Sequence, residues 1–270
     1  ARAHARRFRP DFVFLSKCLA LDPETVESII GGKANAMWYH DPQWYRDLDR
    51  PDIGHVATIG RLAHTFFVTG FDAEWRANGL PALFLPAAGD AEIEPVKPVV
   101  EFASDVAFIG SGYDADRAKL LVRVAQAHNL RVWGPGWDQW KTALDWSGRP
   151  VEKKEFAQVC SSSKVVLGIN PSRAAGGVSY TSDRTWMVML AGGFYLTEYR
   201  AGVASMLKDG EHCAFYSDAE SCISQTGRYL ADTVSRNRIK ADGEAFVRAH
   251  HTYDQRIANL LENREFVNPL

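Results

Sequence analysis

Predicted strands and helices alternate along this chain, and residues 164–197 show the alternation most clearly. Residues 164–169 form a valine-rich apolar run, which is typical of a strand buried on both faces. A polar loop follows, and Ser182 or Asp183 is the predicted N-cap of a helix that ends at Gly192-Gly193. Another apolar run comes next. A strand, a crossover helix and a second strand form a βαβ unit, which requires a parallel sheet.

The same alternation extends through both halves of the chain. An N-cap, a proline and an acid coincide at Asp22-Pro23-Glu24 and predict a helix start there. The mixed residues 43–60 include Trp44 and Tyr45, which we place on a short helix. The predicted strands are residues 11–15, 34–39, 65–69, 82–85, 105–109, 130–133, 164–169, 194–197 and 212–216. The predicted helices are residues 22–30, 72–77, 114–128, 152–160, 183–191, 202–208, 218–230 and 236–263.

A proline-rich segment over residues 86–101 interrupts the alternation and is the best linker in the chain. We therefore expect an α/β protein of two doubly wound, Rossmann-like domains that face a cleft, with residues 1–95 in the first and residues 96–270 in the second. The chain opens on a basic segment that resembles the end of a helix. We accordingly expect the first domain to be incomplete.

Composition excludes several classes of function. The net charge of −2 gives no overall field that would attract nucleic acid or an anionic membrane, and the arginines near the start fit a solvated helix face. No apolar run reaches the ~18 residues of a membrane span. The four cysteines lack CxxC spacing, which favours reduced thiols in the cytoplasm over disulfides or a zinc site. The motifs of serine hydrolases, P-loop proteins and zinc proteases are missing.

Two segments have the pattern of a phosphate site. The loop before Arg184 brings a helix N-terminus to the carboxyl end of a strand, and a cation in the first turn is unfavourable unless an anion lies in front of it. The turn Gly110-Ser111-Gly112 also joins a strand to a helix, with Arg117 one turn further on. Each segment has a plainer interpretation. The first could be an ordinary βαβ loop, since most such loops bind nothing. The second could be a tight turn, because it lacks the third glycine and the ribose-binding acid of the dinucleotide fingerprint.

Other candidates lie at the ends of predicted strands. Trp133 and Trp137 could stack on a base or a sugar, or could fill a hydrophobic gap between helices. His40 and Asp41 are the best general-base candidates, although the same pair could simply start a turn. His250 and His251 fall on a C-terminal helix and are interpreted as structural or exposed.

Five segments of the second half, taken in order, resemble a known family. They are VAFIGSGYDADR (106–117), VVLGIN (165–170), SDRTWMVMLAGGFYLTEY (182–199), DGEHCAFYSD (209–218) and HHTYDQR (250–256). Together they resemble the C-terminal, nucleotide-sugar-binding domain of GT-B glycosyltransferases, most closely the group-1 transferases related to the spore maturation protein CgeB. The first half resembles a GT-B N-terminal domain in its βα rhythm and in WYHD (38–41).

The resemblance implies a cytoplasmic, metal-independent transferase that needs no cofactor and uses a nucleoside diphosphate sugar as donor. The acceptor would be a hydroxyl of a glycan, a protein or a small molecule. His40 or Asp41 would serve as the base if the mechanism inverts, while Arg117 and Arg184 would stabilise the leaving diphosphate. The donor-binding residues implied are Gly110, Ser111, Gly112, Arg117, Asn170, Ser182, Asp183, Arg184 and Thr185.

One residue departs from the family pattern. Met187 stands where the family often has a glutamate that holds the nucleotide ribose. Two alternatives follow from the sequence. The first is a catalytically degenerate module that binds a glycan or a partner. The second is a nucleotide-sugar epimerase on the same fold.

Overall fold

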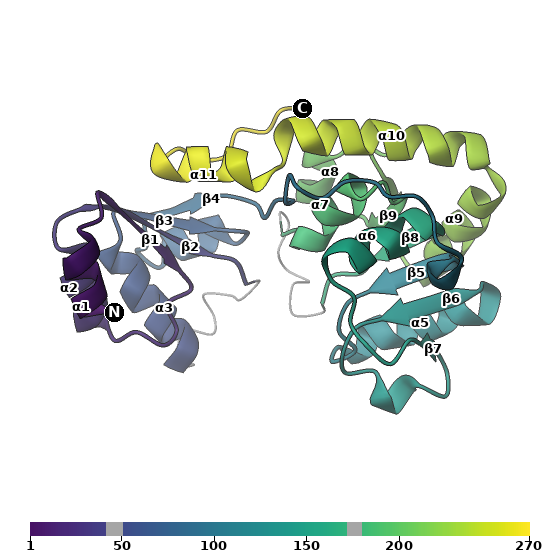
Figure 1. Ribbon diagram of the computed structural model, residues 1–270, viewed down its shortest axis with the longest axis horizontal. Helices are drawn as coiled ribbons and strands as arrows, with labels where there is room; N and C mark the ends of the chain where they lie inside the picture. Colours follow the sequence, from purple (N-terminus) through teal and green to yellow (C-terminus); the bar gives the residue numbers. More distant parts are fainter. Residues whose placement is uncertain (42–50, 172–179) are drawn as a thin grey trace. The chain divides into compact units, whose positions relative to one another are not determined.

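The computed structural model describes residues 1–41, 51–171 and 180–270, and these form two compact units (Figure 1). The first unit contains the described residues up to 87 together with residues 180–181 and 254–267. The second unit contains the remaining described residues from 88 onward, including the last three of the chain. The sequence-based division differs in three places, because it assigned residues 88–95 to the first domain and residues 180–181 and 254–267 to the second.

The first unit is built on a four-stranded parallel sheet in the order β1-β2-β3-β4. Asp22 caps α2 by accepting a hydrogen bond from the Thr25 amide at 2.7 Å, as its sequence predicts. Gly31 ends this helix in the left-handed conformation. The strands are β1 (Phe12–Ser16), β2 (Ala34–Tyr39), β3 (Thr65–Val68) and β4 (Ala82–Phe84), and the helices are α1 (Arg2–Phe8), α2 (Pro23–Ile30), α3 (Pro51–Leu62), α4 (Asp72–Ala77) and α11 (Tyr253–Leu261).

The second unit is built on a six-stranded parallel sheet in the order β10-β9-β8-β5-β6-β7. The strands are β5 (Ser104–Ile109), β6 (Leu130–Trp133), β7 (Asp145–Trp146), β8 (Ser163–Gly168), β9 (Tyr195–Glu198) and β10 (Ala214–Tyr216). The helices are α5 (Ala115–Ala127), α6 (Lys153–Ser162), α7 (Asp183–Leu190), α8 (Ala201–Met206), α9 (Ala219–Ala231) and α10 (Thr233–His250), with short 3-10 turns at Val100–Phe102 and Asp138–Trp140.

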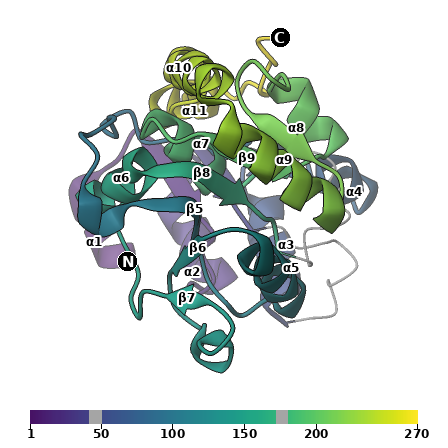
Figure 2. The same ribbon diagram turned by 90° about the vertical axis from the view of Figure 1, so that its right-hand side faces the viewer.

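Strand order in the second sheet reverses between β5 and β8. Because crossovers between parallel strands are right-handed, the reversal places α5 on one face and α7 on the other. Accordingly α5 packs against α9, whereas α7 packs against α10, and the two sets of helices lie on either side of the sheet (Figure 2). This confirms the α/β class and the doubly wound arrangement of the second unit, whereas the first sheet, in the order β1-β2-β3-β4, has no such reversal. The reversal point is also where ligands bind in open parallel sheets.

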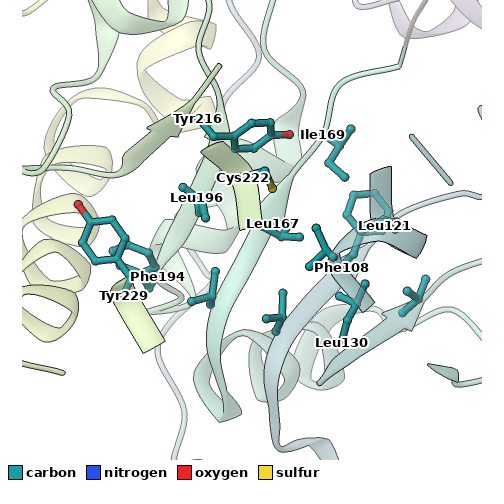
Figure 3. Packing of buried hydrophobic residues seen from close by; sticks show 14 of the residues in the cluster. Phe108, Leu121, Leu130, Leu167, Ile169, Phe194, Leu196, Tyr216, Cys222 and Tyr229 are labelled. Carbon is teal, nitrogen blue, oxygen red and sulfur yellow. The ribbon is translucent and has the colours of Figure 1, made fainter. Parts of the chain in front are cut away.

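Alternate residues of the second sheet form its core under α5 and α9 (Figure 3). Phe108 on β5, Leu167 on β8 and Leu196 on β9 point to this face, and each is fully buried. Leu121 from α5 and Cys222 from α9 close the layer above them. The spacing of two along each strand is what a pleated sheet requires. The core therefore fixes the strand ends that carry polar residues.

The structure differs from the predicted elements at a few places. Helix α3 was not predicted, because its apolar residues are mixed with polar ones. The predicted helix over residues 236–263 is two helices, interrupted where Thr252 forms a bridge with Gly89. Strand β7 was also missed. Trp44 and Tyr45 lie outside the described residues.

The cysteines fit the prediction of reduced thiols. All four are unbonded, and Cys160, Cys213 and Cys222 are buried. Burial raises the pKa of the Cys222 thiol to about 12, which makes it inert at neutral pH. Within the described part of the chain, every helix is too short or too polar to span a lipid bilayer.

Candidate functional site

The carboxyl ends of β5 and β8 adjoin at the reversal point, and the turn Gly110-Ser111-Gly112 follows β5 directly. Its glycines are packed against protein. The Gly112 amide donates to the Pro135 carbonyl at 2.9 Å, and a Cβ at Gly112 would lie 2.4 Å from the Gly136 oxygen. A Cβ at Gly134 would lie 2.2 Å from the Gly110 oxygen. The glycines thus allow two loops to touch, which supports the tight-turn interpretation.

Two arginines converge on the end of β8 from opposite faces of the sheet. Arg117 on α5 is buried and donates to the carbonyl of Ile169 at 3.0 Å and to that of Ser111 at 2.9 Å. Arg184 on α7 donates to the same Ile169 oxygen at 2.8 Å and to the Ile109 oxygen at 2.9 Å. Two cations are therefore held on one carbonyl group at the end of β8.

Arg184 has capacity for a further partner. It forms no ion pair with any acid in the described ranges, and its Nε is buried without a hydrogen-bond acceptor there. A guanidinium carries five N–H donors, of which the two carbonyl bonds use two. The uncompensated charge and the remaining donors suit an anionic ligand.

Three helices begin at this edge, and their N-termini differ. Asp114 caps α5 by accepting from the Arg117 amide at 3.0 Å, and Asp218 caps α9 by accepting from the Ser221 amide at 2.7 Å. The N-cap of α7 is Ser182, which makes no capping bond, and its buried Oγ has no partner among the described residues. The Arg184 amide of α7 donates to the Asp183 carboxylate at 2.8 Å, and the Thr185 amide donates to the Ser182 carbonyl at 3.1 Å. The group left for an anion at this helix start is therefore the Ser182 hydroxyl, at the positive end of the helix dipole.

A pocket of about 290 Å³ lies beside the arginine pair, within the second unit. It is bounded by the N-termini of α5 and α9 and by the ends of β8, β9 and β10. Its lining residues are Asp114, Asp116, Arg117, Leu120, Ile169, Asn170, Glu198, Arg200, Tyr216, Ser217, Asp218 and Ala219. This volume is at the lower end of ordinary ligand sites, which span about 300–1,000 Å³.

Five of the nine predicted donor-site residues lie in the pocket or at the start of α7. Arg117 and Asn170 line the pocket, and Ser182, Asp183 and Arg184 begin α7. The prediction that Thr185 binds the donor is wrong. Thr185 is buried, and its hydroxyl lies 3.1 Å from that of Tyr195 inside the core, so it cannot line a ligand site in this conformation.

The two tryptophans are a second correction. Trp137 is completely buried and donates from its indole nitrogen to the Gly110 carbonyl at 2.9 Å. Trp133 is 2% exposed and packs on Phe102, with the Arg131 guanidinium over its ring. Neither presents a face for stacking on a base or sugar, so the hydrophobic interpretation holds for both.

Sequence reasoning assigned no role to Glu198, Arg200, Ser217 or Tyr216, which line the pocket. A signal was present, because Glu198 and Tyr216 are the last residues of β9 and β10. Polar groups at the carboxyl end of a buried parallel strand are typical ligand positions. Which strand ends adjoin each other, however, depends on a sheet order that the sequence alone did not reveal.

The predicted base candidates lie in the first unit, at the end of β2. The His40 ring packs on Trp38 with centroids 4.3 Å apart, and the His40 carbonyl accepts from the Thr69 hydroxyl at 2.9 Å. Asp41 forms an ion pair with Lys17 at 2.9 Å. The catalytic role of both stays a prediction.

Two adjacent histidines lie at the C-terminal end of α10. His251 is fully buried and stacks on Trp186 with centroids 4.1 Å apart, whereas His250 is exposed.

Over residues 1–41, 51–171 and 180–270, no three histidine, cysteine or acidic side chains gather as a metal site would require.

Comparison with known proteins identifies a relationship across more than half of the chain. Residues 117–262 match the model of a family described as "Glycosyl transferase-like". A search of curated protein sequences finds no match to the chain.

Solved structures share the whole architecture. HepE from Anabaena, in complex with UDP and glucose, is 10% identical, with a TM-score of 0.68 over 97% of this chain and 80% of that one. Sucrose-phosphate synthase from Thermosynechococcus elongatus is 12% identical, with a TM-score of 0.68 over 97% and 75% of the two chains. The pneumococcal O-GlcNAc transferase GtfA, in complex with UDP and GlcNAc, is 9% identical, with a TM-score of 0.62 over 97% and 58%. At such low identity the likeness establishes the GT-B fold.

Proposed function

The chain belongs to the glycosyl transferase-like family, and we propose that it transfers a sugar from a nucleoside diphosphate sugar to an acceptor hydroxyl. The observation that carries this proposal is the start of α7. The positive end of the α7 dipole, the unpartnered Ser182 hydroxyl and the Arg184 guanidinium meet there at the end of β8. A diphosphate would satisfy all three groups at once.

This arrangement favours departure of the diphosphate. Negative charge grows on the leaving group as the bond to the anomeric carbon breaks. Arg184 is held in place by two backbone carbonyls, and Arg117 shares one of them, so neither side chain needs to reorganise during the reaction. Fixed donors of this kind stabilise a transition state more than they stabilise the ground state.

Three finer assignments belong to the same proposal. UDP is the first nucleotide to test, because HepE and GtfA were solved with it. The CgeB-related subgroup is supported by the five ordered segments of the second half. His40 or Asp41 would deprotonate the acceptor, with no metal taking part. The match to the glycosyl transferase-like family favours transfer over the binding-module and epimerase alternatives, although Met187 lacks the carboxylate of the family pattern.

The start of α7 offers a test in which stability and binding change in opposite directions. Ser182→Asp provides the missing cap and places a negative charge at the helix N-terminus, which should stabilise the protein by about 0.5–1 kcal/mol. The same charge should repel a diphosphate and abolish the thermal shift that UDP produces. Ser182→Ala is the matched control and should retain most of that shift.

Two outcomes would contradict the proposal. One is the absence of any shift in the wild-type protein with uridine, guanosine, adenosine and thymidine diphosphates and their sugars. The other is an unchanged shift in Ser182→Asp, which would place the diphosphate elsewhere. Transfer itself is measured as release of nucleoside diphosphate that requires an acceptor, with EDTA present to test metal independence.

A further inference from the structure

A second pocket, of about 300 Å³, lies in the second unit at the other end of α7 from the candidate donor site. Gly192, just beyond the last residue of α7, and Ser161, in the last turn of α6, form part of its wall. Helices between parallel strands end near the point where the next strand begins, so this pocket belongs to the opposite edge of the sheet. Among the described residues, the two pockets have no lining residue in common.

The proline-rich linker forms one wall of this second pocket and α10 forms another, and both walls are held by hydrogen bonds. On the linker side, the Val96 amide donates to the Ser161 hydroxyl at 3.2 Å. From α10, the Arg248 guanidinium donates to the carbonyls of Ala91 and Ile93 at 3.2 and 3.1 Å, so the linker runs beside this helix (Figure 1). The pocket is therefore formed by the fold itself and needs no rearrangement to accept a ligand.

Lys240 on α10 brings a positive charge to this pocket. The side chain is partly buried, and over the described residues its ammonium group makes no ion pair and donates no hydrogen bond. Burial, and then the Arg236 guanidinium one turn earlier, lower the pKa of Lys240. An ammonium group carries three N–H donors, so the pocket contains a cation whose donors are unused.

Glu244 brings a negative charge to the same pocket, four residues further along α10. Its Oε1 accepts from Nε and Nη2 of Arg248 at 3.3 and 3.0 Å, whereas no group in the described part of the chain donates to its Oε2. Side chains four residues apart on a helix are neighbours, yet Glu244 and Lys240 form no ion pair with each other. An unused donor and an unused acceptor therefore line the pocket one turn apart.

The charges around the pocket restrict the class of ligand. Both α6 and α7 end here, and the C-terminal end of a helix carries a partial negative charge. These helix ends and Glu244 oppose a doubly charged phosphate, whereas a single lysine can hold a single carboxylate. The same negative groups favour a positive charge beside that carboxylate.

We propose that this pocket binds a small zwitterion of the amino-acid class. Its carboxylate would accept from Nζ of Lys240, and its ammonium group would donate to Oε2 of Glu244. The remainder of the ligand would pack on the apolar linker residues Pro95, Val96 and Pro98, which line the opposite wall. This inference does not depend on the proposed function, because the site is separate from the donor site.

Thermal shift of the wild-type protein with each of the protein amino acids in turn is the first test. Calorimetry then compares the amino acid that gives the largest shift with two analogues. One is its α-hydroxy acid, which lacks the ammonium group, and the other is the amine that lacks the carboxylate. Loss of either charged hydrogen bond should weaken binding roughly tenfold or more.

Two variants assign the two ends of the ligand. Lys240→Met should bind the amino acid and the amine equally, and Glu244→Gln should bind the amino acid and the hydroxy acid equally. Lys154→Met is the matched control, because it removes the same charge at the exposed start of α6 and should bind as the wild-type protein does.

Three results would overturn the inference. The first is the absence of a shift with every amino acid. The second is equal binding of the hydroxy acid to the wild-type protein, which would exclude the contact between the ammonium group and Glu244. The third is unchanged binding in Lys240→Met, which would place the ligand elsewhere. None of these results bears on the proposed function, since both variants should retain the thermal shift that UDP produces.

Discussion

Replacing Arg184 with methionine should weaken the fold as well as ligand binding. The side chain donates to the carbonyls of Ile109 and Ile169, and its guanidinium lies 4.9 Å from the centre of the Phe108 ring. Methionine retains the apolar contact but makes neither hydrogen bond. Two bonds from a charged donor contribute about 3 kcal/mol, and relief of the repulsion from Arg117 reduces the net loss to about 2 kcal/mol.

For a unit of this size, such a loss lowers Tm by about 4–8 °C. Thermal unfolding followed by tryptophan fluorescence, without ligand and with saturating UDP, measures both effects. Arg123→Met is the matched control, because the Arg123 pair with Glu220 is exposed and its loss should leave Tm nearly unchanged. An Arg184→Met protein with wild-type Tm would refute the contribution of Arg184 to the stability of the fold. A full UDP shift in that variant would refute the role in binding.

Three further predictions concern other parts of the second unit. Gly134→Ala should lower the free energy of unfolding by about 3 kcal/mol, measured by thermal unfolding, because the new Cβ would lie 2.2 Å from the Gly110 oxygen. The new Cβ of Gly148→Ala meets open space, so this variant should lower the same free energy by only about 1 kcal/mol. Burial lowers the pKa of His212, so as the pH falls the unfolded state binds a proton at this residue before the folded state does. The urea concentration at the unfolding midpoint should therefore decrease as the pH drops below about 6.5. A His212→Gln protein that keeps this pH dependence would contradict the assignment. Burial also lowers the pKa of Lys240, which means that its charged form is less stable in the folded protein than in the unfolded chain. Lys240→Met removes this charge and should raise Tm at pH 7. A lower Tm would show that other groups compensate the charge.

The fold was predictable because its strands are buried on both faces. Such strands appear as continuous apolar runs, and residues 105–109 and 164–169 were placed within a residue or so of β5 and β8. Helix caps were equally visible, since Asp22 and Asp218 precede their helices directly. These signals are local, and local signals are what a sequence displays.

The site was only partly predictable, because its residues meet through the order of the strands. Glu198 and Arg117 are far apart in sequence and share a pocket only because β9, β8 and β5 are neighbours. The stacking role predicted for the tryptophans was wrong for a related reason. Residue type favoured a stacking surface, but Trp137 lies under a turn that closes over it. Burial of a side chain is set by packing that its own segment does not encode.

The path of the chain, which leaves the first unit near residue 87 and returns to it at residue 254, sets an order of events during synthesis. The Arg256 Nε donates to the Pro86 carbonyl at 3.0 Å, the Thr65 hydroxyl donates to the Asn263 side chain at 2.7 Å, and the Phe84 amide donates to Glu265 at 3.1 Å. None of these bonds can form until the ribosome has translated the whole second unit. The unit begun first is thus completed last, and the intervening unit can fold while the first still exposes part of its surface.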